Sequence, residues 1–208
     1  MANPTDLPAF YRLTRKPADR TGLDPAAMTA RVVEPLLDGI EPGARVAVAV
    51  GSRGIADLPE VVRAVVEALT AHGCRPFLFP AMGSHGGATA EGQRALLGKI
   101  GIDAEALGVT IESDMDTVSL GRTESGLDVR FDRHAHAADA TLLINRVKPH
   151  TDFIGRIGSG LIKMAVIGCG KRQGAEMVHR EAKTRGYESV LMKVGRFVLD
   201  KSNIVGGV

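Results

Sequence analysis

The chain has 208 residues, enough for one sizeable domain or two small ones with a buried core. Its formal charge of +2, with basic and acidic residues interleaved, and its lack of tryptophan argue against a nucleic-acid partner. We find no signal-peptide layout and no apolar run of the roughly 20 residues that cross a bilayer, so we expect a soluble, cytoplasmic protein without a membrane partner.

Helices and strands alternate along the first half of the chain. Asp24 is placed as the N-cap of a helix, with Pro25 at its first position. The apolar patterns then predict, in chain order, a helix from Pro25 to Leu37, a strand at 45–50, a helix at 58–71, a strand at 76–79 and a helix at 89–100. This alternation predicts Rossmann-like βαβ units in a mostly parallel sheet, with helices on both faces.

The second half continues the pattern with more β structure. It predicts a strand at 109–112, β structure at 117–132 around a turn at 124–126, a strand at 141–145, helices at 172–183 and 187–200, and a further strand beginning within 201–208. The fold class is therefore α/β. The sequence ends on the apolar stretch IVGGV (204–208), whereas native C-termini are more often polar. We therefore interpret residues 1–208 as a single domain cut from a longer protein.

Three predicted strands end in loops that carry charged or titratable side chains. The loops hold Arg53, His85 and His150, the first two beside glycines in the segments GSRG and GSHGG. Ligands of open α/β sheets bind outside the carboxyl ends of the strands, so we expect the three loops to converge on one site. For any single loop, a tight turn between a strand and a helix is the alternative.

No standard nucleotide or zinc motif is present. The segment 168–171 is similar to part of a Walker loop, but Ala165 stands where the first glycine belongs and Arg172 follows the lysine. Gly168, Gly170 and Gly174 are also spaced one residue too widely for a dinucleotide fingerprint. Cys74 and Cys169 lack the spacing of a zinc site, and we expect free, buried thiols in a reducing compartment.

Other cationic residues divide into ordinary and unusual positions. Lys163 lies within an apolar run, where an ammonium is costly unless something holds it, whereas Lys171 is expected on a surface turn. His72 is expected at a helix end, and His134 and His136 in a solvated segment. His179 is interpreted either as a helix-surface residue or as a ligand.

Four segments, taken together and in order, resemble the nickel-dependent lactate racemase family. They are GSRGI (51–55), GSHGGAT (83–89), KPHTDFIGRIGSGLIKM (148–164) and GAEMVHREA (174–182). The resemblance covers nearly the whole chain, but only the N-terminal, cofactor-bearing domain of those proteins. It implies that the family's C-terminal domain is absent from residues 1–208.

The resemblance implies a cofactor. In that family a nickel-pincer nucleotide, a pyridinium mononucleotide with two sulfur arms, is attached to a lysine through a thioamide. Lys163 resembles the tethering lysine and His179 the nickel ligand, with Ser159 and Gly160 as further cofactor-binding residues. An amine nucleophile suits a covalent tether, and imidazole with sulfur and carbon donors suits square-planar nickel.

The resemblance also implies an isomerase that racemises or epimerises a small 2-hydroxy acid by hydride transfer. His85 and His150 resemble the paired acid/base histidines, and Arg53 the arginine that orients the substrate carboxylate. Val50 stands where lactate-type members carry an aspartate, and the segment between His150 and Lys163 is longer, so we expect a substrate other than lactate. The isolated domain is expected to be inactive.

A second function remains open from the residues alone. A non-catalytic module could bind an anionic metabolite or nucleotide at the strand-end glycine loops, through backbone N–H groups. The expected partners are thus a small molecule and the protein's own C-terminal domain, and self-association into a homo-oligomer is left open. The residues do not say which 2-hydroxy acid is bound.

Overall fold

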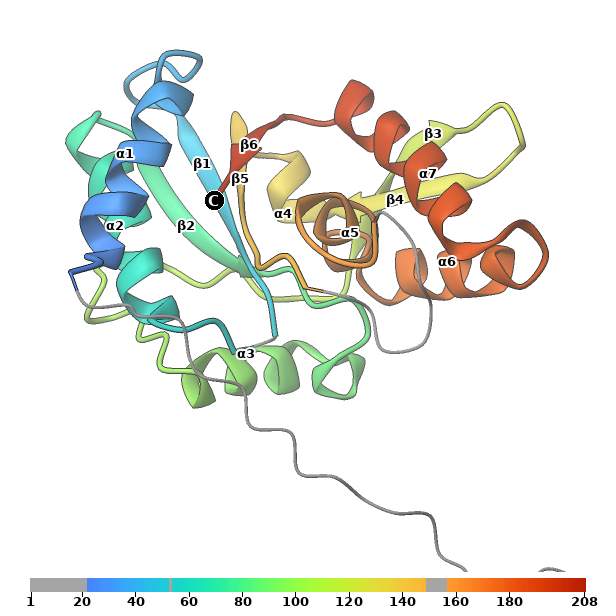
Figure 1. Cartoon of the computed structure of the whole chain (residues 1–208), viewed down its shortest axis with the longest axis horizontal. Helices are drawn as coiled ribbons and strands as arrows, with labels where there is room; N and C mark the ends of the chain where they lie inside the picture. The colour runs from blue at the N-terminus through green and yellow to red at the C-terminus, as the bar shows by residue number, and fades with distance from the viewer. Residues whose placement is uncertain (1–21, 53, 149–156) are drawn as a thin grey trace, which may run out of the picture.

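The structure is a computed structural model that describes residues 22–52, 54–148 and 157–208 (Figure 1). The helices are α1 (Pro25–Leu37), α2 (Leu58–Ala71), α3 (Ala90–Lys99), α4 (Arg133–His136), α5 (Leu161–Lys163), α6 (Lys171–Arg185) and α7 (Tyr187–Lys201), with a 3-10 turn at Gly86–Ala88 and a π-helix at Met164–Gly168. The strands are β1 (Arg45–Val50), β2 (Arg75–Pro80), β3 (Thr117–Arg122), β4 (Asp128–Asp132), β5 (Ala140–Ile144) and β6 (Ile204–Gly207).

Four of the strands form one parallel sheet in the order β2-β1-β5-β6. In the register of this sheet, Val50 at the end of β1 lies beside Pro80 of β2 and Ile144 of β5. The three strands therefore finish at the same edge. Strands β3 and β4 form a separate antiparallel hairpin. The predicted α/β class with a mostly parallel sheet is confirmed.

Strand β1 divides the interior into two apolar cores because its side chains alternate between the two faces of the sheet. Val46, Val48 and Val50 pack in a core with residues of α1 and α2. Ala47 and Ala49 face the other core, which contains residues of the hairpin, the π-helix, α6 and α7. Helices thus cover both faces of the sheet, as predicted, with α1 and α2 on one side and α6 and α7 on the other (Figure 1).

Most of the predicted elements are present, including the strand at the end of the chain. Asp24 caps α1, accepting hydrogen bonds from the backbone of the first turn through its carboxylate. The strand predicted at 109–112 is reduced to a single bridge between Leu78 and Ile111. The π-helix was not predicted, and such bulges are often found at functional sites.

Two predictions about single side chains have different outcomes. His134 is not solvated: it is half-buried in α4, with Nε2 2.7 Å from Oδ2 of Asp114. Cys74 and Cys169 are free and buried, as predicted, and burial raises the pKa of both thiols. Within the described ranges, no helix is both long and apolar enough to cross a membrane.

Close packing of the π-helix against the end of β2 gives a test of this arrangement. A Cβ added at Gly168 would lie 2.6 Å from the carbonyl oxygen of Ala81, whereas one added at Gly98 on α3 would meet nothing within 4 Å. We predict that Gly168→Ala lowers the free energy of unfolding by about 1–3 kcal/mol through overpacking.

The matched variant Gly98→Ala should raise that free energy by about 0.5–1 kcal/mol, because alanine is favoured over glycine inside a helix. Urea unfolding of the two variants measures both values. Equal stability of Gly168→Ala and the unmodified protein would contradict the close approach.

Candidate functional site

The loops after β1 and β2 meet at the shared edge of the sheet. Ser52, two residues after β1, is hydrogen-bonded through its hydroxyl to Nδ1 of His85, in the loop that follows β2. His85 is exposed and Ser52 half-buried. A hydrogen bond at one ring nitrogen sets the tautomer and orientation of a histidine, so Ser52 holds the His85 ring in place. Arg53, predicted from the same loop, lies outside the described residues.

The backbone of the His85 loop is held from below by Gln93 of α3. This side chain is fully buried, and its Nε2 donates hydrogen bonds to the carbonyl oxygens of Gly83, at 3.0 Å, and His85, at 3.2 Å. Sequence analysis missed Gln93 and Ser52 because neither stands out from the polar residues around it. Only the fold brings Gln93 beneath the loop.

Hydrogen bonds join the residues directly after β5 to Ser159 and Gly160. Nδ2 of Asn145 donates to the carbonyl oxygen of Gly160 at 2.9 Å, and the Ser159 hydroxyl both accepts from the backbone N–H of Lys148 and donates to its carbonyl oxygen, each at 2.6 Å. Gly160 is buried with φ +86°, a conformation that favours glycine. These contacts fasten the two ends of the segment that contains His150, which itself lies outside the described residues.

Lys163 and His179 lie on the same aromatic ring. Nζ of Lys163, at the end of α5, is 5.6 Å from the centroid of the Tyr187 ring. The His179 ring, on α6, is stacked on the same ring with a centroid distance of 6.4 Å and an interplanar angle of 26°. Lys163 is half-buried and His179 is exposed. The two residues come from different helices, α5 and α6, and both contact Tyr187, so the three form one cluster.

Sequence analysis missed Tyr187. It stands at the first position of α7, after Gly186, and nothing in the local sequence distinguishes it from an ordinary helix start. Burial raises the pKa of the Tyr187 phenol to about 12, so the ring stays neutral at physiological pH. It therefore offers Lys163 a neutral π face of the kind that ammonium groups contact.

A backbone hydrogen bond and a close side-chain approach join the segment after Lys163 to the two strand-end loops. The N–H of Gly83 lies 3.3 Å from the carbonyl oxygen of Gly168, at the end of the π-helix. A Cβ added at Gly51 would lie 3.2 Å from the methyl carbon of Met164, the residue after Lys163. The π-helix thus packs directly under the loops that carry Ser52 and His85.

Lys171 is not on a surface turn, contrary to the prediction. It is 0% exposed, and Nζ lies 3.0 Å from Oδ2 of Asp132, which is equally buried. Nζ also donates to the carbonyl oxygen of Pro80 at 2.8 Å and stands 5.9 Å from the centre of the Phe79 ring. The sequence suggested a polar turn, but the acidic partner comes from β4, which makes a buried ammonium tolerable.

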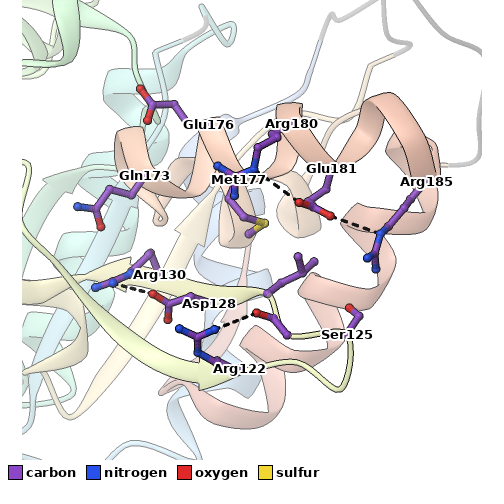
Figure 2. Close-up of a pocket in the computed structure, with 12 residues that line it drawn as sticks. Arg122, Ser125, Asp128, Arg130, Gln173, Glu176, Met177, Arg180, Glu181 and Arg185 are labelled. Atoms are coloured by element: carbon purple, nitrogen blue, oxygen red, sulfur yellow. Dashed lines mark hydrogen bonds and ion pairs between the residues drawn. The ribbon is translucent and has the colours of Figure 1, made fainter.

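A separate hollow of about 560 Å³ lies between the β3–β4 hairpin and α6 (Figure 2). None of the predicted site residues that the structure describes lines it. Its charges are largely paired: Arg130 lies 2.6 Å from Asp128, and Arg185 lies 3.4 Å from Glu181. Most of the charged side chains that line the hollow are thus already engaged in ion pairs.

Across the described ranges, no three His, Cys, Asp or Glu side chains come together as a metal-binding group. A histidine that fills one coordination position beside a cofactor's own donors does not require such a group. Of the predicted site side chains, the structure therefore describes three isolated candidates: the Lys163 amine, the His179 imidazole and the His85 imidazole.

Comparisons with known proteins agree on one group. A family model described as "Lactate racemase N-terminal domain" matches residues 26–189. Among solved structures, the lactate racemase apoprotein from Thermoanaerobacterium thermosaccharolyticum is similar with a TM-score of 0.58 and 13% sequence identity, over 86% of this chain and 47% of that chain. At this identity the likeness shows the fold alone, and this chain spans about half the length of that racemase. No curated protein matches the chain.

The environment of Tyr187 predicts a pH dependence. Its pKa in the folded chain, about 12, lies above the value of roughly 10 for a free phenol. The stability contributed by the neutral phenol is therefore complete below about pH 10 and is lost as the pH rises toward 12. Absorbance titration should show a late tyrosine step that Tyr187→Phe removes. A Tyr187→Phe titration curve that retains this step would contradict the buried environment.

Proposed function

The chain belongs to the lactate racemase N-terminal domain family, and from this membership we propose that it is the cofactor-bearing domain of a 2-hydroxy-acid racemase or epimerase. The observation that carries the proposal is the cluster of Lys163 and His179 on the Tyr187 ring. These are the residues that the family resemblance assigns to the cofactor, and they come from different helices. A binding module without a cofactor gives no reason for an amine and an imidazole to share one ring.

The described residues fit the nickel-pincer nucleotide. The Lys163 amine would supply the nitrogen of the thioamide tether, and the His179 imidazole would fill one position on nickel. When bound, the cofactor would supply hydride-transfer chemistry for the C2 hydrogen of the substrate. Tyr187 would hold the tether and the ligand at a set separation. Gly160 and Ser159 shape the turn that leads into Lys163.

His85 would move the hydroxyl proton of the substrate. An imidazole titrates near neutral pH, which suits a group that must both accept and return a proton. The Ser52 hydrogen bond orients its ring. We assign the same role on the opposite face of the substrate to His150, and the substrate carboxylate to Arg53, on the strength of the sequence motifs. Inversion needs a proton-transferring group on each face.

The substrate is proposed to differ from lactate. Val50, at the position of the lactate-type aspartate, is 0% exposed at the end of β1 and packs in the core beneath α1 and α2. Its side chain is a hydrocarbon and has no carboxylate to take the place of the aspartate. A larger 2-hydroxy acid, bound with the help of the longer segment before Lys163, fits these differences.

Activity is proposed to belong to a longer protein. The solved racemase has about twice the length that this chain covers, and water would enter a site that no second domain closes. We propose that residues 1–208 are the N-terminal domain of such a protein and are inactive alone. The small-molecule substrate and the second domain are the proposed partners.

Covalent loading of the cofactor tests the proposal. With the cofactor-making enzymes coexpressed, the protein should gain the mass of the nickel-pincer nucleotide, and Lys163→Ala should abolish this gain because the amine is lost. The matched control is Lys183→Ala, an exposed lysine on α6, which should load fully. Lys171→Ala is unsuitable as a control because that side chain is buried in an ion pair.

Intact-protein mass spectrometry, followed by peptide mapping, measures the loading. Equal loading of the unmodified protein and Lys163→Ala would return Lys163 to a structural role. Absence of any covalent addition to the unmodified protein would favour the alternative, a module that binds an anionic metabolite.

A further inference from the structure

A buried row of polar side chains lies beneath the His85 loop. The Lys171 ammonium faces Oδ2 of Asp132 at 3.0 Å and Oε1 of Gln93 at 3.4 Å. From the other end of its amide, Gln93 donates to the carbonyl oxygens of Gly83 and His85. The side chains of Asp132, Lys171 and Gln93 are all 0% exposed. The buried charge pair is thus connected to the loop through a single amide group.

The ammonium determines which way the Gln93 amide faces. Lysine can only donate hydrogen bonds, whereas a carboxamide has one accepting and one donating end. With Oε1 turned toward Lys171, Nε2 must face the two loop carbonyls. If the amide rotated by half a turn, Oε1 would meet two carbonyl oxygens and Nε2 would meet a cation. Both contacts would be unfavourable.

Asp132 lies at the other end of this row of side chains. Its Oδ1 accepts a hydrogen bond from the N–H of Ala135 at 2.9 Å, which caps α4, while Oδ2 faces Lys171. A buried ion pair is weak evidence for stability on its own, because desolvation offsets much of the attraction. A requirement to orient the loop gives this costly arrangement a reason that stability alone does not.

We propose that Asp132, Lys171 and Gln93 act as positioning residues for His85. Gln93 holds the backbone carbonyl of His85 and Ser52 holds its ring, so the residue is constrained at its backbone and at one ring nitrogen. This proposal rests on the proposed function, in which His85 exchanges a proton with the substrate hydroxyl. A small displacement of such a group is enough to slow a reaction strongly.

The variant Gln93→Leu, made in the 208-residue chain without cofactor, tests the proposal. Leucine has a similar volume and leaves the Lys171–Asp132 pair in place, but it removes both hydrogen bonds to the loop. Histidine side-chain NMR should show shifted or broadened His85 resonances, assigned with His85→Ala, and unchanged His72 resonances. The matched control Gln173→Leu removes an exposed glutamine bonded to Thr117 at 2.6 Å and should leave His85 unchanged.

Activity gives a second measurement in the cofactor-loaded, full-length protein. Gln93→Leu should lower kcat roughly ten- to a hundredfold with little change in KM, because the proton-transfer group is displaced while substrate contacts remain. Unchanged His85 resonances in folded Gln93→Leu would overturn the positioning role.

Two further outcomes are separable. An unmodified protein that does not racemise 2-hydroxy acids would contradict the proposed function, while the NMR result would still decide the positioning role. If Gln93→Leu does not fold, Gln93→Met, whose unbranched side chain has nearly the same length, also removes both hydrogen bonds to the loop. The same NMR shift is expected there, and its absence would also overturn the proposal.

Discussion

Parallel pairing of β1 with β2 and β5 is the constraint on which the rest of the structure depends. Because Val50, Pro80 and Ile144 are in register, the chain leaves all three strands at one edge of the sheet. The Ser52–His85 hydrogen bond follows from that alignment. Alternation along β1 then requires helices on both faces, and the helix-rich side supplies the segment that carries Lys163. The backbone pairing of the sheet thus places the loops of Ser52 and His85 side by side, and the side-chain contact between them depends on it.

Two lysines close together in sequence show how environment separates roles. Lys171 is enclosed and matched by a buried carboxylate, so it acts as a fixed charge within the protein. Lys163 lies at the half-buried end of α5 against a neutral ring, a setting that suits the tethering role proposed for it. The π-helix between them packs against the strand-end loops and sets their separation.

Hydrophobic periodicity was sufficient to predict the strands of both sheets and the five longer helices, because most bury one continuous apolar face, but it missed the short helices α4 and α5 and the π-helix. It failed at 109–112, where only one bridge forms, and at Lys171, where a polar Gly-Lys-Arg segment concealed burial. The motifs pointed to Lys163, His85 and His179, but not to Tyr187 or Gln93. Those two act through contacts between distant segments, and no local pattern encodes such contacts.

The fate of the C2 hydrogen distinguishes this domain's proposed chemistry from an ordinary two-base racemase. Removing a proton from carbon beside an anionic carboxylate forms a poorly stabilised carbanion, whereas moving only the hydroxyl proton to His85 avoids it. In the full-length, cofactor-loaded protein, racemisation in heavy water should give product with little deuterium at C2. Extensive deuterium at C2 would contradict the proposed route and favour removal and return of the C2 proton by two histidines.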